Sequence, residues 1–126
     1  MSQETMEVVL DHIYARRQRD VDAVAATLDP EVIHEGVRDD LICRGRDEVL
    51  VNVRRSLQAH RFEIDRLELI DAGDHAVLGV AGPRFRDVEE ASPNGEVFIV
   101  FTVRDGRIVR MRDFRSRDDA LAAASR

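Results

Sequence analysis

Asp105-Gly106-Arg107-Ile108-Val109-Arg110-Met111-Arg112-Asp113-Phe114 is a turn dipeptide followed by an alternating segment typical of a strand. Successive side chains of a strand point to opposite faces. Asp113 should therefore share a face with Val109 and Met111, while Arg110 and Arg112 point the other way. A carboxylate at the end of an apolar stripe is costly to bury unless it is paired or used. The segment thus predicts a pocket with one ionisable group.

The composition is that of one globular domain spanning residues 1–126, with 44% hydrophobic and 35% charged residues. An apolar run near the ~18 residues of a membrane span is lacking, and the N-terminus does not have the pattern of a signal peptide. Cys43 is the single cysteine, which excludes an internal disulfide and favours the cytoplasm. The net charge of −6 disfavours nucleic acid as a partner.

Helical periodicity dominates the first half of the chain and strand alternation the second half. Asp20 is placed to cap a second helix that Pro30 ends, and Ser116 with Asp119 opens the last helix. A change of parity predicts a β-bulge near residues 65–66. We expect a first helix that carries residues 6–14, further helices at residues 21–28, 47–58 and 117–124, and strands at residues 31–37, 62–69, 75–86, 96–104 and 107–114.

This order predicts an α+β fold in which a curved, cone-shaped, mixed or antiparallel sheet wraps around three N-terminal helices, with a short C-terminal helix. A concave apolar interior of this kind binds small molecules. The strand at 96–104 is apolar on both faces, so its outer residues, Phe98 and Val100, need a cover. A homodimer through the outer face of the sheet would supply it.

Four strings of the chain resemble, in order, the SnoaL-like branch of the nuclear-transport-factor-2-like superfamily, which includes ketosteroid isomerases, limonene-epoxide hydrolase and polyketide cyclases. The strings are Arg19-Asp20-Val21-Asp22, Leu28-Asp29-Pro30-Glu31-Val32, Gly45-Arg46-Asp47-Glu48-Val49 and the segment 105–114. The resemblance implies that Asp113 occupies the place of a catalytic aspartate.

Other catalytic positions of these relatives carry different residue types here. The arginine and second aspartate of the hydrolase correspond to Val80 and Gly82, and its tyrosine and asparagine correspond to His34 and Gly36. The oxyanion aspartate and the helix-borne tyrosine of the isomerase correspond to Ile99 and His12. The resemblance therefore implies the fold and one acid, without either complete set of catalytic residues.

Asp113 and His34 are the candidate catalytic residues. Asp113 could act as a general base, or it could be a structural carboxylate paired with an arginine or capping the last helix. By resemblance His34 faces the cavity, where a neutral imidazole could hold a water or accept a proton. The alternative is a histidine hydrogen-bonded in the core. Together the two side chains could act around one water.

The candidate binding residues surround these two. His12, and less directly Tyr14, could donate a hydrogen bond to a carbonyl or an oxyanion, although ordinary packing is the alternative for both. Arg84 could clamp an anion or pair with Asp113, or lie exposed at the rim. The cavity wall is expected to include Phe62, Ile99, Phe101 and Met111.

Motifs for metals, organic cofactors and nucleophilic triads are lacking. The four histidines do not have metal-ligand spacing, and neither a Gly-x-Ser-x-Gly string nor a phosphate-binding glycine loop occurs. The sequence thus favours a cofactor-independent hydrolase, isomerase or cyclase acting on a small, apolar, oxygenated molecule. The alternative is a non-catalytic module for ligand binding or dimerisation with a degenerate site.

Overall fold

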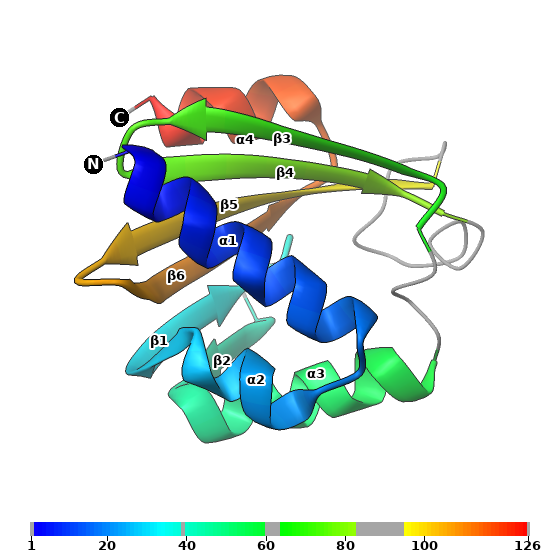
Figure 1. Cartoon of the computed structure of the whole chain (residues 1–126). Helices are drawn as coiled ribbons and strands as arrows, with labels where there is room; N and C mark the ends of the chain where they lie inside the picture. Colours follow the sequence, from blue (N-terminus) through cyan, green and yellow to red (C-terminus); the bar gives the residue numbers. More distant parts are fainter. Residues whose placement is uncertain (1, 39, 60–63, 83–94, 126) are drawn as a thin grey trace.

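The computed structural model describes residues 2–38, 40–59, 64–82 and 95–125 and has an α+β architecture (Figure 1). Four helices and six strands occur in this part of the chain. In chain order they are α1 (Ser2–Arg17), α2 (Val21–Ala26), β1 (Leu28–Glu35), β2 (Ile42–Arg44), α3 (Arg46–Gln58), β3 (Arg66–Ala72), β4 (His75–Ala81), β5 (Glu96–Arg104), β6 (Arg107–Phe114) and α4 (Arg117–Ala124).

The described strands form one mixed sheet in the order β2-β1-β6-β5-β4-β3. β1 runs parallel to β6, and all other neighbours are antiparallel. The predicted fold class is confirmed: a mixed sheet, three N-terminal helices and a short C-terminal helix. The conical curvature of the sheet stays a prediction. Because β1 and β6 are neighbours, residues about 80 positions apart in the sequence meet at the centre of the sheet.

The predicted helix caps are present. Asp20 accepts a hydrogen bond from the backbone N–H of Ala23, and Ser116 accepts one from Asp119. The predicted end of the second helix at Leu28 is wrong. α2 ends at Ala26, and Leu28 begins β1 as a fully buried residue, since its strand pairs with β6 at Ile108. Tertiary pairing therefore ends this helix two residues earlier than its periodicity suggests.

The strand predictions need three corrections. The short strand β2, which pairs with β1 from Ile42 to Arg44, is absent from the predicted strands. β3 and β4 pair residue for residue from Arg66 to Ala72, so the bulge predicted at 65–66 does not interrupt β3. The pairing of β5 with β6 slips instead between Thr102 and Val103. Residues 62–63 and 83–86 of the predicted strands lie outside the described residues.

The slip at Thr102 changes which face Val109 occupies. Thr102 pairs with Arg110 but Val103 pairs with Ile108, so Val109 is the extra residue of a bulge. Ile108 and Met111 are buried in the same core cluster, whereas Val109 is only half-buried. The prediction that Val109 shares a face with Met111 is therefore wrong. Beyond the bulge the alternation is regular, so Asp113 does share the inner face with Met111.

Two apolar layers cover the sheet. The larger lies on the inner face, against α1, α2 and α3, and contains Phe101 and Met111. The smaller lies on the outer face, where Phe98 and Val100 pack with the alanines of α4. The expected cover for Phe98 and Val100 is thus supplied by the chain's own last helix, which removes this argument for a dimer. Dimerisation itself stays a prediction.

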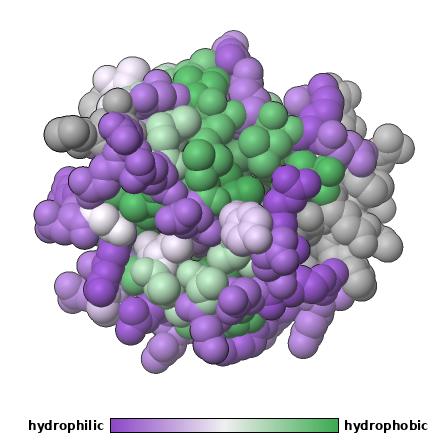
Figure 2. Space-filling model, viewed as in Figure 1, coloured by the Kyte–Doolittle hydropathy of each residue, from purple (hydrophilic) through white to green (hydrophobic). Residues whose placement is uncertain are grey.

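Apolar side chains also gather on the surface near the place where α1 meets β3 and β4 (Figures 1 and 2). Leu10 on α1 and Leu67 on β3 are 50% and 40% exposed. None of the described helices combines the length and apolar character needed to cross a membrane.

Candidate active site

His34 and Asp113 meet on the inner face of the sheet. His34 lies on β1 opposite Met111 of β6, and Asp113 follows two residues later on β6. The distance from His34 Nε2 to Asp113 Oδ1 is 2.8 Å. The side chains are 11% and 13% exposed. The two predicted catalytic residues are therefore in direct contact, without a water between them.

The hydrogen bond indicates which nitrogen of His34 carries the proton. When the Asp113 carboxylate is ionised it only accepts, so Nε2–H is then the donor and a neutral ring has its lone pair on Nδ1. Nδ1 is buried and has no hydrogen-bond partner among the described residues. A buried polar atom left in this state costs about 1–3 kcal/mol. Nδ1 is thus the nitrogen of His34 that Asp113 does not engage.

A cavity of about 390 Å³ adjoins the pair, between the β1–β2 edge of the sheet and α3. Cys43 lies directly opposite His34 on β2 and belongs to its wall. Burial, followed by the charges of Glu48 and Asp113, raises the pKa of the Cys43 thiol. This cysteine is therefore protonated near neutrality, which disfavours a thiolate nucleophile.

The α3 side of this cavity is polar and regularly spaced. Glu48, Asn52 and Arg55 line it at positions i, i+4 and i+7 of the helix, and such residues share one helix face. Leu41, Ile42 and Val51 supply apolar wall. The cavity can thus accommodate both an apolar skeleton and oxygen atoms.

Gly36 has a packing reason for lacking a side chain. A Cβ at this position would lie 2.7 Å from Leu41 Cβ, and the Gly36 N–H donates to the Leu41 carbonyl at 2.6 Å. The β1–β2 connection therefore occupies the space where the resemblance places a polar catalytic side chain.

His12 faces the interior, and both of its nitrogens bind other protein groups. Nδ1 lies 2.8 Å from Thr27 Oγ1, and Arg16 Nε donates to Nε2 at 2.8 Å. The ring packs edge-on against Phe101 with centroids 5.5 Å apart. Burial, and then the charges of Arg16 and His34, hold the pKa of His12 well below its usual range. In this arrangement neither nitrogen of His12 is left to bind a ligand.

Sequence reasoning did not select Arg16, because it lies beyond the apolar positions that identified the first helix. The helix continues to Arg17, and Arg16 lies one turn after His12 with only 8% of its surface exposed. Burial lowers the pKa of Arg16 to about 10, although the nearby Asp113 carboxylate raises it. The i, i+4 spacing from His12 was the available signal for this residue.

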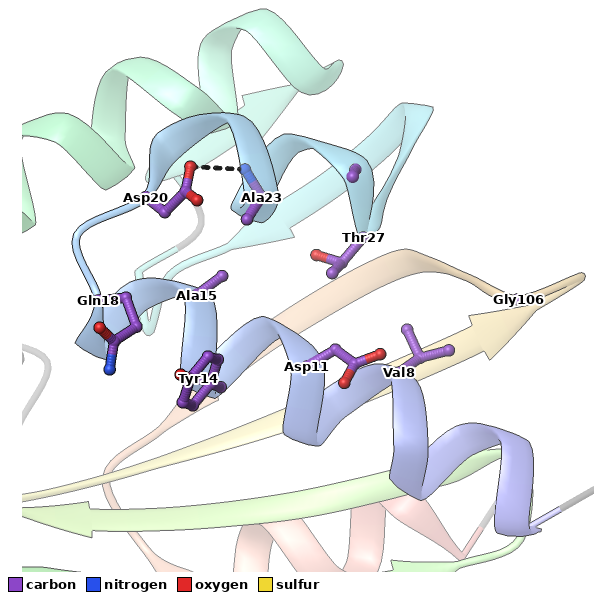
Figure 3. A pocket seen from close by; sticks show the side chains of 10 residues that line it. Val8, Asp11, Tyr14, Ala15, Gln18, Asp20, Ala23, Thr27 and Gly106 are labelled. Atoms are coloured by element: carbon purple, nitrogen blue, oxygen red, sulfur yellow. Dashed lines mark hydrogen bonds between the residues drawn. The ribbon is translucent and has the colours of Figure 1, made fainter.

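Tyr14 is on the other side of α1 from His12 and is 66% exposed. It lines a separate cavity of about 400 Å³ between α1, α2 and the turn at Gly106 (Figure 3). Tyr14 therefore does not join His34 and Asp113. Arg84 and Phe62 lie outside the described residues.

Three of the predicted wall residues are on the inner face. Ile99 pairs with Asp113 in the register of β5 and β6 and is half-buried. Phe101 and Met111 are 2% and 1% exposed and fill the core beside His12. Their contact with a ligand stays a prediction.

The described residues do not include a group of three or more His, Cys, Asp or Glu side chains arranged to hold a metal ion.

Comparison with known proteins agrees with the observed fold. The family model described as the SnoaL-like domain matches residues 9–111. No protein of curated function matches the sequence. A candidate polyketide cyclase from Sinorhizobium meliloti is 22% identical, with a TM-score of 0.64 over 90% of this chain and 98% of its own.

Two further solved structures share the fold. A candidate ketosteroid isomerase from Kribbella flavida is 18% identical, with a TM-score of 0.68 over 92% of this chain and 80% of its own. An LEH-like epoxide hydrolase of M. tuberculosis is 23% identical, with a TM-score of 0.63 over 98% and 90%. At these identities the similarity establishes the fold, which isomerases, cyclases and hydrolases share.

Proposed function

The chain belongs to the SnoaL-like family, and we propose that it is a cofactor-independent acid–base catalyst in which His34 and Asp113 are the catalytic residues. The observation that carries this proposal is the 2.8 Å contact between His34 Nε2 and Asp113 Oδ1, with Nδ1 of His34 buried and unpartnered among the described residues. A histidine held by a carboxylate through one nitrogen is poised for proton transfer through the other.

The proposed chemistry is a proton transfer through His34 Nδ1. The neutral ring takes a proton from the substrate or from a water, and the Asp113 carboxylate stabilises the imidazolium that forms. The imidazolium then returns the proton to another atom. Isomerisation, ring closure and epoxide opening all need such a transfer. A positioned acid–base group contributes about 10²–10⁴-fold to the rate of reactions of this kind.

The proposed substrate is a small molecule with an apolar skeleton and at least one oxygen atom. The cavity of about 390 Å³ suits this size. Leu41, Ile42 and Val51 would contact the skeleton, while Asn52 and Arg55 would bind oxygen atoms.

The test is a turnover screen of small epoxides, cyclic enones and cyclisable ketones, followed by Asp113→Asn and His34→Gln. Both variants should lower kcat/KM for a converted compound by about 100-fold or more. Glu35→Gln is the matched control, because Glu35 is adjacent to His34 on β1 but pairs with Arg110 on the outer face. Turnover within a few-fold of wild type in both Asp113→Asn and His34→Gln would exclude the catalytic role.

A non-catalytic ligand-binding or dimerisation module is the second candidate. It is favoured by Phe101 and Met111, which fill the interior, and by the hydrogen bond that already engages Asp113 with His34. In that case a compound from the same panel should raise the Tm of wild type and Asp113→Asn equally and emerge unchanged. Sedimentation equilibrium tests the dimer, and only monomer at micromolar concentration would exclude it.

A further inference from the structure

Three carboxylates line the cavity beside His34, and each of them already has a partner within the protein. Asp113 Oδ1 lies 2.8 Å from His34 Nε2. Asp40 Oδ1 lies 3.3 Å from Arg38 Nε. Glu48 Oε1 accepts the last backbone N–H of β2 at 3.0 Å. The acids of this cavity therefore have less capacity to bind a ligand than their number suggests.

The polar side chains that follow on α3, Asn52 and Arg55, differ from these acids. Neither forms a side-chain hydrogen bond or an ion pair with any of the residues that the structure describes. Asn52 is half-buried and Arg55 is exposed. A carboxamide offers two N–H donors, and a guanidinium offers five. The groups left to bind a ligand are thus mainly hydrogen-bond donors, and one of them is a cation.

The helix separates these donors from its own acid. Asn52 follows Glu48 by four residues and Arg55 follows it by seven, so the three side chains share one face of α3. Arg55 lies about 10 Å further along the helix axis than Glu48. A ligand group bound to Arg55 is therefore kept away from the Glu48 carboxylate, while it stays in the cavity that His34 and Asp113 also line.

The charge of Arg55 also acts on the part of the cavity that adjoins the His34–Asp113 pair. Cys43 lies directly opposite His34 in the pairing of β1 with β2. Burial, followed by the charges of Glu48 and Asp113, raises the pKa of its thiol, and the charge of Arg55 opposes that rise. The cation of α3 and the carboxylate of β6 thus influence the same wall residue.

We propose that the substrate carries a carboxylate, which Arg55 binds together with Asn52, while the reacting part of the molecule reaches His34. The inference rests on the proposed function of His34 and Asp113. The planar guanidinium of an arginine matches the two oxygens of a carboxylate and can form two parallel hydrogen bonds with them. A phosphate is disfavoured, because Asp113 and Glu48 would repel its greater negative charge more strongly. The substrate class is therefore a small oxygenated carboxylic acid rather than a neutral molecule.

The test is an NMR titration of the whole protein with cyclohexanecarboxylate and with its neutral analogue cyclohexanecarboxamide. The two compounds have the same ring and nearly the same shape, and they differ in charge. Wild type should bind the carboxylate about tenfold more tightly, because a hydrogen bond between charged groups is stronger than one to a neutral amide. In about 1 M NaCl this preference should shrink, since salt screens an exposed cation.

Arg55→Gln is the decisive variant, and Arg54→Gln is its matched control. Arg54 is the preceding residue of α3 and is also exposed, but it is not among the residues that line the cavity. Arg55→Gln should weaken binding of the carboxylate about tenfold and leave binding of the carboxamide unchanged. Arg54→Gln should keep the wild-type preference.

Three results would overturn the proposal. The first is equal dissociation constants for the two compounds in wild type. The second is a preference for the carboxylate that survives in Arg55→Gln. The third is a wild-type protein that does not bind the carboxylate at millimolar concentration.

The binding titration and the turnover screen fail separately. A preference for the carboxylate that depends on Arg55, together with full turnover in Asp113→Asn, would support the role of Arg55 and reject catalysis by the His34–Asp113 pair. Lost turnover in Asp113→Asn, together with equal binding of the two compounds to wild type, would do the reverse.

Discussion

His34 with Asp113, and Glu35 with Arg110, are two charged pairs that connect the same two strands. They involve consecutive residues of β1 but lie on opposite faces of the sheet. The inner pair has one contact of 2.8 Å and side chains 11% and 13% exposed. In the outer pair Arg110 donates to both oxygens of Glu35, at 2.8 and 3.0 Å, and the side chains are 45% and 32% exposed.

The difference is that both oxygens of the outer carboxylate are hydrogen-bonded, whereas the inner pair leaves one nitrogen of His34 without a partner among the described residues. Both oxygens of Glu35 are occupied, so the outer pair has little capacity left to bind or transfer a proton. His34 keeps one buried nitrogen without a partner among the described residues. Its environment is also drier, so electrostatic interactions there are screened less by water and salt. The inner pair therefore suits chemistry, and the outer pair suits a modest connection between strands.

The largest expected effect concerns the packing of Phe101 on the inner face of the sheet. Phe101→Ala should lower the free energy of unfolding by about 3–5 kcal/mol, because Phe101 is 2% exposed and supports His12. Arg104→Ala, at the exposed end of the same strand, should change it by less than about 0.5 kcal/mol. Urea denaturation measures both. Equal losses of unfolding free energy in the two variants would mean that Phe101 is not part of a packed core.

The next effect compares the pairs directly. Asp113→Ala should cost about 1–3 kcal/mol of unfolding free energy, since it leaves a second buried polar atom on His34 without a partner. Glu35→Ala should cost about 0–1 kcal/mol, the usual range for exposed ion pairs. The same urea measurement applies. A larger loss for Glu35→Ala than for Asp113→Ala would reverse the comparison.

The interior should also make the protein sensitive to acid through His12. Its pKa is lowered in the folded protein by burial, so below about pH 6.5 the unfolded chain binds a proton that the folded one does not. Stability should therefore fall as pH falls below that value, with a slope approaching about 1.4 kcal/mol per pH unit. Burial lowers the pKa of His75 as well, which adds to the slope with the same sign.

Unfolding free energies of His12→Gln between pH 7.5 and pH 5 test this point. A glutamine can accept from Arg16 and donate to Thr27 without titrating, so the variant should have a flatter pH dependence than wild type. His75→Gln is the control at the edge of the interior and should flatten it less. If stability depends on pH in the same way in wild type and in His12→Gln, the lowered pKa of His12 is contradicted.

The smallest effect concerns salt. The cost of Glu35→Gln, about 0–1 kcal/mol at low ionic strength, should fall toward zero in 1 M NaCl, where the Debye length is about 3 Å. The cost of Asp113→Asn should change little, because salt does not enter the interior. Equal salt dependence for the two variants would indicate that the inner pair is solvated.

Much of the fold was predictable because local chemistry and tertiary structure agree. Asp20 and Ser116 cap the helices that follow them. Asp113 shares the inner face with Met111 as strand alternation indicates, and His34 meets it there as the family resemblance implies. Other features had no local signal. The bulge that displaces Val109 depends on how β5 meets β6. Nothing in the local sequence distinguishes Arg16 from the other arginines, and only tertiary packing buries it.

The sequence by itself determined the family, the fold class and the two residues that meet across β1 and β6. It did so because periodicity and capping are read from neighbours in the chain, and the order of short strings identifies the topology. Only the tertiary structure decided that Asp113 touches His34 directly, that His12 is committed to Thr27 and Arg16, and that α4 covers Phe98 and Val100. These outcomes depend on contacts between residues far apart in the chain. The register of the sheet and the burial of each side chain determine which polar groups come into contact.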